Sequence, residues 1–434
     1  MRRDSVPFEH PWDEVLVCEV ANVIVGGTPS TAEPSFWDGE IRWMASGDVH
    51  QHHIFDVPGR ISEKGHRWSN AVVVEPQAVA MALAGQGKTR ATVALTHVPI
   101  CTNQSVALIK PRDNQLDPEF LYQSLIPRYE EMRARSAGGG RAGLTKSILE
   151  RLPIQLPHPL EQRRIAEILS TLDDEIELTN ALIAKHQQIK TGLIHDLFTR
   201  GITSDGHLRP TREQDPDLYK ESALGWIPKE WEVRPFRSVL TGNLQNGYFK
   251  KPELVGTGYK LVNVSELYQP FGIDTDHPNV ERVAATSADF HKFGVQEGDL
   301  FFTRSSLVLS GIAQCNTVLK LMEPILFECH VIRGKPDKNI VNPAFLGLYF
   351  QTPGARRELM SRAKQTTMTT ISQPDIVSVP VLRPPLDEQT SIAQRITSNM
   401  MSIHAEEAHL TKLFQQKHGL MHDLLTGKVR VKEN

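Results

Sequence analysis

The chain lacks what secreted and membrane proteins need. Its 434 residues include only four cysteines, and no two of them show a Cys-x-x-Cys spacing, so neither a disulfide framework nor a zinc site is indicated. The longest uninterrupted apolar run, Ala78 to Ala84, is far shorter than the roughly 20 residues that cross a membrane. The basic N-terminus has no apolar segment of the kind found in signal peptides. We therefore expect a cytoplasmic protein that is neither secreted nor membrane-spanning.

The chain also lacks an excess of charge of one sign. A formal net charge of −3 gives no global sign of nucleic-acid binding. Such binding can nevertheless rest on local basic patches that acidic residues elsewhere cancel. The length favours about two to four domains of ordinary size.

A repeated stretch dominates the sequence. Leu144 corresponds to Ile371 and Gly201 to Lys428, at a constant offset of 227 residues. About fifteen of the forty-one pairs from Glu161 onward are identical, several times the number expected by chance. The chain therefore contains two copies of one helical unit.

Short β-rich segments precede each copy, so the chain reads as β-module, helix, β-module, helix. In the first module the apolar run Val23-Ile24-Val25 stops at the turn cluster Gly26-Gly27-Thr28-Pro29-Ser30. Asp117-Pro118-Glu119-Phe120 opens a short helix, and Asn342-Pro343-Ala344-Phe345 repeats it. The expected boundaries are 1–155 for the first module, 156–202 for the first long helix, 203–224 for a polar linker, 225–381 for the second module, and 382–434 for the second long helix and tail.

Each long helix carries an apolar seam with steps of four and three, which predicts a coiled coil. The helices follow Pro159 and Pro385 and span roughly 40 residues, or about 60 Å. We expect them to pair with each other antiparallel; alternatively, each merely covers its own sheet. The predicted pairing residues are Ile165, Leu169, Leu172, Ile176, Ile183, Leu193, Leu197, Ile392, Ile396, Ile403, Leu410, Leu413, Leu420 and Leu424. The middle of the seam is polar, at Thr179, His186, Asn399 and Glu406.

These features together resemble the specificity (S, HsdS) subunit of type I restriction-modification systems. The resemblance covers essentially the whole chain and rests on the order of several motifs as well as on the repeat. The second half departs more: no Gly-Gly-Thr-Pro follows Trp231, Thr390-Ser391 replaces Arg163-Arg164, and Leu307 to Gly311 replaces a glycine-lysine turn. The motifs are Glu161-Gln162-x-x-Ile165-Ala166, Gly192-Leu193-x-His195-Asp196-Leu197-x-Thr199, Gly26-Gly27-Thr28-Pro29-Ser30, Ser46-Gly47-Asp48, Asn103-Gln104-Ser105 and Gly298-Asp299-Leu300.

The resemblance implies an α+β protein with two β-rich target recognition domains and two long helices in an antiparallel coiled coil. Each recognition domain would bind one half of a bipartite site in double-stranded DNA, and the helices would set the spacing and dock two methyltransferase subunits. Restriction subunits can join such complexes. It implies no catalytic residue, cofactor or metal in this chain: S-adenosylmethionine belongs to the methyltransferase partner, and ATP and Mg to a restriction partner.

One segment imitates a nucleotide-binding loop. Ala82 to Thr89 fits a relaxed P-loop pattern with alanine in the first glycine position. A P-loop must open a helix whose N-terminus faces the phosphates. The following segment, Arg90 to Pro99, instead reads as a strand. We therefore expect a turn in which Lys88 and Arg90 meet DNA, as the family resemblance implies.

Two histidine patterns raise further alternatives. His50-Gln51-His52-His53 has no partnering cysteine or carboxylate pattern, so a solvated loop explains it better than a metal site. His195-Asp196 and His422-Asp423 suggest acid–base pairs, but adjacent residues on a helix do not face each other. Their recurrence in both copies fits a symmetric contact or a partner-docking surface better.

DNA contacts can be predicted only by residue type and position. Arg and Lys favour phosphates and guanine, Asn and Gln favour adenine, and Tyr can stack. Each residue alone could equally be a solvated polar loop residue. The candidates are Thr28, Ser46, Gln86, Lys88, Arg90, Asn103 and Arg141 in the first module, and Asn246, Tyr248, Lys250, Arg304, Ser305, Lys364 and Gln365 in the second.

A different class of function also fits the sequence. The coiled coil and the β-modules could form an adaptor that binds proteins and not DNA. A sequence-specific, salt-dependent shift of duplex DNA would distinguish the DNA-binding subunit from the adaptor.

Overall fold

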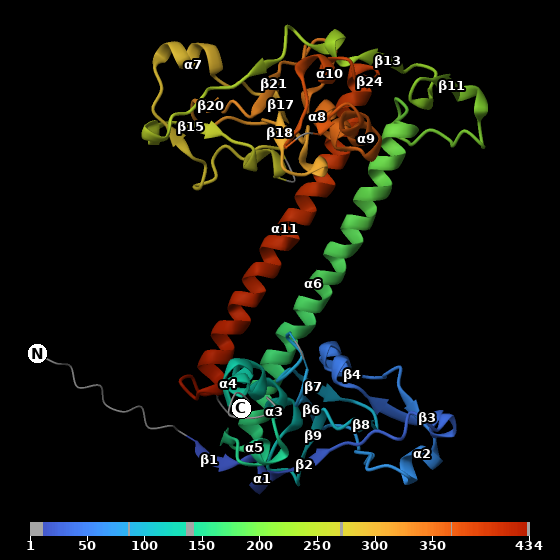
Figure 1. The fold of residues 1–434 in the computed structure, drawn as a ribbon, viewed down its shortest axis with the longest axis vertical. Helices are drawn as coiled ribbons and strands as arrows, with labels where there is room; N and C mark the ends of the chain where they lie inside the picture. Colours follow the sequence, from blue (N-terminus) through green and yellow to red (C-terminus); the bar gives the residue numbers. More distant parts are fainter. Residues whose placement is uncertain (1–11, 86, 136–142, 270–271, 366, 432–434) are drawn as a thin grey trace, which may run out of the picture. The chain divides into compact units, whose positions relative to one another are not determined.

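The computed structural model describes residues 12–85, 87–135, 143–269, 272–365 and 367–431. It divides into two compact units: unit 1 comprises Met1–Asn180 and His409–Asn434, and unit 2 comprises Ala181–Ala408. Both boundaries fall inside the two long helices, so each unit contains one β-rich module and half of each helix (Figure 1). The predicted α+β fold with an internal repeat is confirmed.

Unit 1 is built on a five-stranded sheet and a three-stranded sheet. Their strands include fully buried apolar segments, which is why Val79–Ala82 and Val93–Thr96 show no alternation of apolar and polar residues. The elements of unit 1 outside the long helices are β1 Asp13–Leu16, α1 Val17–Val20, β2 Ala21–Val25, β3 Trp37–Met44, β4 His53–Ile54, β5 Arg60–Ile61, α2 Glu63–Arg67, β6 Val79–Ala82, β7 Val93–Thr96, β8 Cys101–Thr102, β9 Val106–Pro111, α3 Pro118–Leu125, α4 Tyr129–Arg135, α5 Lys146–Glu150 and β10 Pro153–Leu156.

The strand order of unit 1 brings distant segments together. The five-stranded sheet has the order β2-β9-β6-β7-β4, and the three-stranded sheet has the order β5-β3-β8. A separate antiparallel pair, β1 with β10, joins the start of the module to the segment before the long helix, with Glu14 opposite Gln155. The first strand of the module is therefore paired with its last strand, directly before the long helix begins.

Unit 2 repeats this plan with shorter strands. The sheet β14-β21-β17-β19 corresponds to β2-β9-β6-β7, and β16-β15-β20 corresponds to β5-β3-β8. The elements of unit 2 outside the long helices are β11 Tyr219–Ser222, β12 Gly225–Pro228, β13 Glu232–Pro235, β14 Gln245–Asn246, β15 Val255–Val262, β16 Arg282–Val283, α7 Ser287–Phe293, β17 Leu300–Thr303, β18 Ser305–Ser306, β19 Cys315–Thr317, β20 Ile325–Phe327, β21 Val331–Gly334, α8 Pro343–Gln351, α9 Pro353–Ser361, β22 Lys364–Gln365, β23 Thr369–Thr370, α10 Gln373–Val377 and β24 Pro380–Arg383.

The two long helices lie within the predicted ranges 156–202 and 382–434. Helix α6 spans Pro159–Thr199 and α11 spans Leu386–Leu425. Proline suits the first turn of a helix because the missing N–H has no partner there. Each helix is followed by a glycine in the left-handed region, Gly201 with φ +66° and Gly427 with φ +67°, which is the usual way to end a helix.

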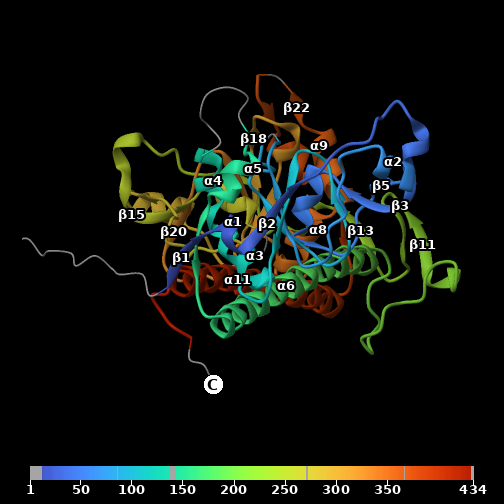
Figure 2. The ribbon, with the colours of Figure 1, turned by 90° about the horizontal axis from the view of Figure 1, so that it is seen from below.

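Within each unit the two helices run antiparallel. In unit 1, Lys417 pairs with Asp173, and His409 Nε2 lies 3.3 Å from the Glu175 carboxylate. The ends of α6 and α11 in this unit lie side by side (Figure 2). In unit 2, His186 Nδ1 and Asn399 Nδ2 are 3.4 Å apart. The predicted antiparallel coiled coil with a polar middle is thus confirmed, and the alternative that each helix covers only its own sheet is wrong.

The predicted pairing residues are all buried or half-buried. The terminal ones also belong to the cores of the modules. Ile165 and Leu169 pack in the core of unit 1, whereas Leu197 and Ile392 pack in the core of unit 2. The seam therefore fixes each module to the helices as well as pairing the helices.

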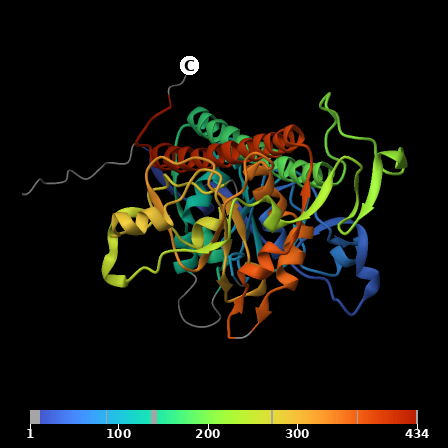
Figure 3. The same ribbon diagram turned by 90° about the horizontal axis from the view of Figure 1, so that it is seen from above.

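The segment expected as a linker has its own structure. Within residues 203–224, Arg209 is buried, and β11 pairs with β12 in a hairpin that projects from the rest of unit 2 (Figures 1 and 3). The observed units also divide the long helices in their middle and not at the expected module boundaries. In the described part of the chain, no helix combines the length and the apolar character needed to cross a membrane.

The Glu-Gln pair at the start of α6 ties that helix to its module. The Glu161 carboxylate is buried, accepts a hydrogen bond of 3.1 Å from Trp12 Nε1, and forms an ion pair with Arg430. The Gln162 side chain accepts a hydrogen bond from the Asp117 amide at 2.8 Å and donates to two backbone carbonyls.

The same arrangement recurs in unit 2. The Glu388 carboxylate accepts a hydrogen bond of 3.1 Å from Trp231 Nε1 and forms an ion pair with the buried Arg209. The Gln389 side chain accepts a hydrogen bond of 2.8 Å from the Asn342 amide. The repeated Glu-Gln motif is therefore structural: it orients each helix at the point where it leaves its module.

Candidate nucleic-acid interface

Three loops of unit 1 meet at one edge of its sheets. The Gly27 amide donates to the Thr102 carbonyl at 2.9 Å, and the Asn103 amide donates to the Met44 carbonyl at 3.0 Å. The Thr28 hydroxyl donates to the Gln104 side chain. These contacts bring together the loops after β2, after β3 and before β9, which carry the predicted residues Thr28, Ser46 and Asn103. We call this arrangement the loop cluster.

Close backbone approach explains the glycine at the centre of the loop cluster. A Cβ atom at Gly26 would lie 1.9 Å from the Thr102 carbonyl oxygen, so no other residue fits without moving the backbone. The glycine therefore allows the β2 loop to pass directly over the residues that precede β9.

The P-loop-like segment is a hairpin turn. It connects the antiparallel strands β6 and β7, and no helix follows it. The predicted strand is confirmed, and the geometry that a P-loop requires is absent from this described segment. Lys88 is exposed at the turn, and His50 Nε2 lies 3.1 Å from the Thr89 hydroxyl, which places the turn beside the loop after β3.

Helix α4 supports this hairpin, which the sequence did not indicate. Arg133 Nη1 donates to the Gly87 carbonyl at 2.8 Å, and the Tyr129 hydroxyl donates to the Lys88 carbonyl at 3.2 Å. Tyr129 and Arg133 are four residues apart, so the sequence could have shown that they lie on one face of a helix. Arg90 is half-buried beside the hairpin. Two further predicted residues, Gln86 and Arg141, lie outside the described residues.

Unit 2 contains an equivalent loop cluster that departs from the first in sequence. The Tyr248 amide donates to the Phe327 carbonyl at 2.7 Å, as Gly27 does to Thr102. A Cβ at Gly247 would lie 2.3 Å from that same carbonyl oxygen, so Gly247 takes the place of Gly26. The second module therefore has a glycine in the structural position of Gly26, although no Gly-Gly-Thr-Pro motif follows Trp231.

The predicted residues near Gly247 are partly engaged within the protein. Asn246 accepts a hydrogen bond of 3.1 Å from Gln373. Lys250 forms an ion pair with Glu281 and donates to Asn263 at 2.9 Å. The Tyr248 ring packs edge-on against Phe293 with ring centroids 5.9 Å apart, and burial raises the pKa of its hydroxyl.

A small sheet gathers the other four predicted residues of unit 2. Strands β18, β23 and β22 place Ser305 opposite Thr370, and Thr370 opposite Lys364. Arg304 immediately precedes β18, and Gln365 follows Lys364. Arg304, Lys364 and Gln365 are exposed, and the Ser305 hydroxyl lies 3.1 Å from His330 Nδ1. These side chains form a compact polar and basic surface.

Several other arginines near the helix starts already have hydrogen-bond or ion-pair partners within the protein. Arg128 and Arg135 both pair with Glu131, and Arg362 pairs with Glu358. Arg356 donates to the Ala313 carbonyl at 2.6 Å, and burial lowers its pKa. These arginines are therefore weaker candidates for DNA contact than the residues of the loop clusters.

The structure offers little support for a metal site. Among the described residues, Glu328, Cys329 and His330 form a group whose potential ligand atoms lie within 4.8 Å of one another. Burial raises the pKa of the Cys329 thiol, which disfavours the thiolate that binds metals. His50, His52 and His53 are not part of any such group in the described residues.

Two histidines of unit 1, His52 and His97, are harder to protonate than a free imidazole because their pKa values are lowered. His53 Nδ1 lies 2.9 Å from His97 Nε2. Burial, and next the neighbouring imidazole of His53, lower the pKa of His97. Burial also lowers the pKa of His52, against the opposing effect of Asp173; His53, Lys417 and His50 lower it further.

We expect acid to destabilise unit 1 through these histidines. Their unfolded pKa is near 6.5 and their folded pKa is lower, so below pH 6.5 the unfolded state binds more protons and stability falls as pH falls. Replacing His97 by glutamine should reduce the loss of melting temperature between pH 7.5 and pH 5.5. The matched change at the exposed His404 should not; an equal effect of both changes would contradict this explanation.

Comparisons with known proteins agree with this arrangement. The family model described as the type I restriction modification DNA specificity domain matches residues 9–188 and 228–413. The MjaVIII specificity subunit of Methanocaldococcus jannaschii is 26% identical over 337 residues, covering 76% of this chain and 74% of that protein. The MjaIX specificity subunit of the same organism is 24% identical over 441 residues, covering 97% and 94%.

A solved structure shares the fold over the full length. The S subunit of a type I restriction-modification system from M. genitalium covers 99% of this chain and 99% of its own, with a TM-score of 0.61 at 15% sequence identity.

Proposed function

Because this chain belongs to the type I restriction-modification DNA specificity family, we propose that it is the non-catalytic subunit that selects the DNA sequence in such a complex. Each module binds one half of a bipartite target in double-stranded DNA. The chain itself supplies no cofactor chemistry in this proposal. Two methyltransferase subunits bring S-adenosylmethionine, and restriction subunits, where present, bring the ATP- and Mg-dependent reaction.

The observation that carries this proposal is the duplicated loop cluster. Both units use a glycine to pass one loop over the next, at Gly26 and Gly247. Around that shared frame the exposed polar residues differ: Thr28 and Lys88 in unit 1, and Arg304, Lys364 and Gln365 in unit 2. One backbone frame with two sets of polar side chains is what two different half-sites require.

The long helices supply a spacing element in this proposal. Helices of 41 and 40 residues are each about 60 Å long. One turn of B-DNA measures about 34 Å, so two modules on such helices suit half-sites more than one turn apart. Tethering two weak binding sites also raises the overall affinity.

Replacing Lys88 by alanine should weaken DNA binding without changing any affinity for ATP. Lys88 is exposed at the hairpin turn, where its charge suits a phosphate. Loss of one phosphate contact should reduce the slope of log K against log salt concentration by about 1. Lys110, which bonds to the Gln77 carbonyl near the other end of the sheet, provides the control Lys110→Met. A micromolar dissociation constant for ATP, lost in Lys88→Ala, would instead support a P-loop.

A mobility-shift titration tests the proposed function against the adaptor alternative. The chain should bind duplex DNA in a salt-dependent way, and addition of its methyltransferase partner should sharpen binding to one sequence. Binding that ignores DNA sequence even with that partner present would favour the adaptor.

A further inference from the structure

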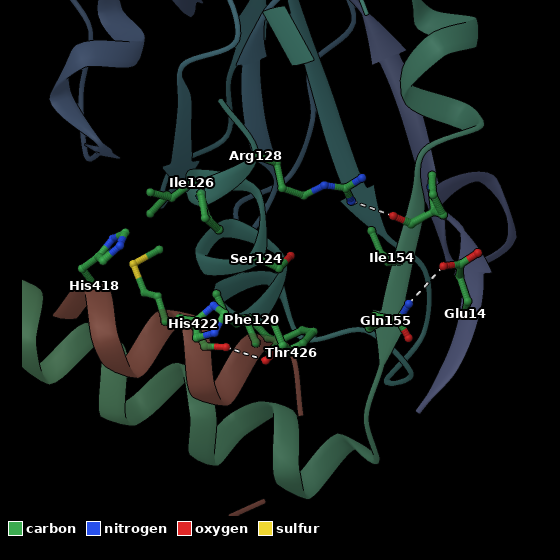
Figure 4. A pocket seen from close by; sticks show the side chains of 14 residues that line it. Glu14, Phe120, Ser124, Ile126, Arg128, Ile154, Gln155, His418, His422 and Thr426 are labelled. Carbon is green, nitrogen blue, oxygen red and sulfur yellow. Dashed lines mark hydrogen bonds between the residues drawn. The ribbon is translucent and has the colours of Figure 1, made fainter. Parts of the chain in front are cut away.

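Unit 1 contains an open pocket that the proposed DNA contacts do not use (Figure 4). Its volume is about 540 Å³, which is within the range of ligand-binding pockets. It lies between α3, the strand pair β1–β10 and the last turns of α11. The principal lining side chains are Phe120, Ser124, Arg128, Gln155, Met421 and Leu425.

The internal repeat shows what fills the equivalent place in unit 2. Helix α8 repeats α3, so Phe345 corresponds to Phe120 and Tyr349 to Ser124; the long-helix offset makes Phe198 the counterpart of Leu425. Tyr349 and Phe198 are buried, with 4% and 7% of their surfaces exposed. Their ring centroids lie 5.9 Å apart, and Phe198 also packs 5.2 Å from Phe345.

Tyrosine at this place also makes a polar contact. The Tyr349 hydroxyl donates to the Pro380 carbonyl at 2.9 Å. Pro380 is the counterpart of Pro153, which lines the pocket of unit 1. Unit 2 thus fills the site with two rings, one of which carries the donor to this carbonyl. Unit 1 has serine and leucine there and remains open, and its Pro153 carbonyl accepts from Arg128 Nη1 at 2.6 Å.

The wall of the pocket in unit 1 is also more polar than the equivalent surface in unit 2. Gln155 and Glu14 line the pocket and bond to each other at 3.0 Å, whereas their counterparts in unit 2 are Leu382 and Val233. Gln155 Oε1 is buried and has no hydrogen-bond donor among the described residues. A buried acceptor without a hydrogen bond destabilises the protein, and a donor from a bound partner would remove this free-energy cost. His418 and His422 are exposed at the rim on α11.

We propose that this pocket receives the ring of a tyrosine or tryptophan from the methyltransferase subunit that docks on unit 1. The inference rests on the proposed function and goes further, because it names the chemistry of a contact and restricts it to one unit. An aromatic ring matches the shape that Tyr349 and Phe198 fill in unit 2. A hydroxyl or indole N–H matches the unpaired amide oxygen of Gln155. The Pro153 carbonyl, in contrast, already accepts a hydrogen bond of 2.6 Å from Arg128 Nη1 (Figure 4).

The proposal predicts unequal binding of the two methyltransferase subunits. A subunit that docks on unit 1 buries an aromatic side chain in the pocket, and one that docks on unit 2 meets a surface that the chain's own rings have closed. Buried aromatic anchors dominate binding energies at protein interfaces, so the subunit on unit 1 should bind first.

Closing the pocket tests the proposal. The double variant Ser124→Tyr, Leu425→Phe copies the residues of unit 2. Titration of the full-length chain with its methyltransferase subunit, followed by native mass spectrometry, should show that the tighter of two binding steps weakens at least about tenfold, while the weaker step is unchanged. Indole, used as a free probe, should bind the wild-type chain and not the double variant. Asn114→Tyr adds a ring at an exposed loop position of the same unit and should change neither result.

Each outcome has a distinct meaning. If the wild-type chain binds no methyltransferase subunit, the proposed function fails. If it binds and the double variant binds with both steps unchanged, the pocket proposal fails. If indole does not bind the wild-type chain, or binds the double variant equally well, the pocket does not accept an aromatic ring and the proposal is again overturned. An unchanged melting temperature and circular dichroism spectrum would show that the double variant folds.

Discussion

Replacing Glu388 by alanine is expected to lower the free energy of unfolding by about 3–5 kcal/mol, the usual cost of breaking a buried ion pair by removing one partner. Only 7% of the Glu388 side chain and 8% of the Arg209 side chain are exposed to solvent. The same carboxylate also accepts hydrogen bonds from Trp231 Nε1 and, at 2.8 Å, from the Ile202 amide. One substitution would therefore leave the Trp231 and Ile202 donors without their acceptor. It would also leave Arg209 with only the exposed Glu230 as an ionic partner. Urea unfolding followed by circular dichroism would measure the effect.

Two matched substitutions separate the buried network from simple loss of charge. Asp387 is exposed in the same first turn of α11, and Asp387→Ala should cost no more than about 1 kcal/mol. Glu161→Ala removes the equivalent carboxylate of unit 1. It should cost less than Glu388→Ala, because 55% of the Arg430 side chain is exposed and can return to water. Equal losses for Glu388→Ala and Asp387→Ala would contradict the role assigned to the network.

Lengthening both long helices by seven residues is expected to change the spacing of the DNA target and leave its half-sites intact. Seven residues are about two helical turns and add about 10.5 Å, or about three base pairs. A whole heptad also preserves the phase of the seam. Insertions after Asn180 and after Ala408 fall where the two units divide. Methylation of the original target should fall at least about 100-fold, because only one module can then meet its half-site.

The control for this insertion changes the chain length without changing the helices. Seven residues inserted between Ala223 and Leu224 lengthen the turn of the β11–β12 hairpin. Methylation of the original target should then remain close to that of the wild type. If the helix insertion altered the half-site sequences themselves, the helices would not be the spacing element.

The sequence predicted the features that rest on local pattern. The seam from Ile165 to Leu197 indicated the antiparallel pair, since apolar residues at that spacing must face a partner. The turn cluster at Gly26 to Ser30 correctly indicated the end of a strand, and the structure places Thr28, Ser46 and Asn103 on loops that meet there. Strand character after Arg90 correctly argued against a P-loop.

Contacts between distant segments could not be predicted in the same way. Gly247 was missed because it lies 16 residues after Trp231, whereas Gly26 lies 14 residues after Trp12, so alignment by a constant offset fails there. Arg209 and Arg430 hold equivalent carboxylates from segments that the repeat does not align. Lys250 has the residue type expected of a DNA contact, but its ion pair with Glu281 depends on strands that are far apart in the sequence.

The pocket illustrates a further limit of sequence analysis. Ser124 and Tyr349 can be aligned from the repeat, but the alignment does not show that both face the end of a long helix. Only the structure shows that two differences between the repeats, Ser124 in place of tyrosine and Leu425 in place of phenylalanine, line the same cavity and together keep it open.

The central claim is that this chain directs methylation to a DNA target read in two separate parts. Methylation-sensitive sequencing of host genomic DNA, with and without this chain, tests it most directly. We predict methylated adenines within one bipartite motif, in which two specified parts flank a spacer of unspecified sequence, and loss of that methylation when the chain is deleted. Methylation that persists without the chain, or that follows a continuous motif with no spacer, would contradict the claim.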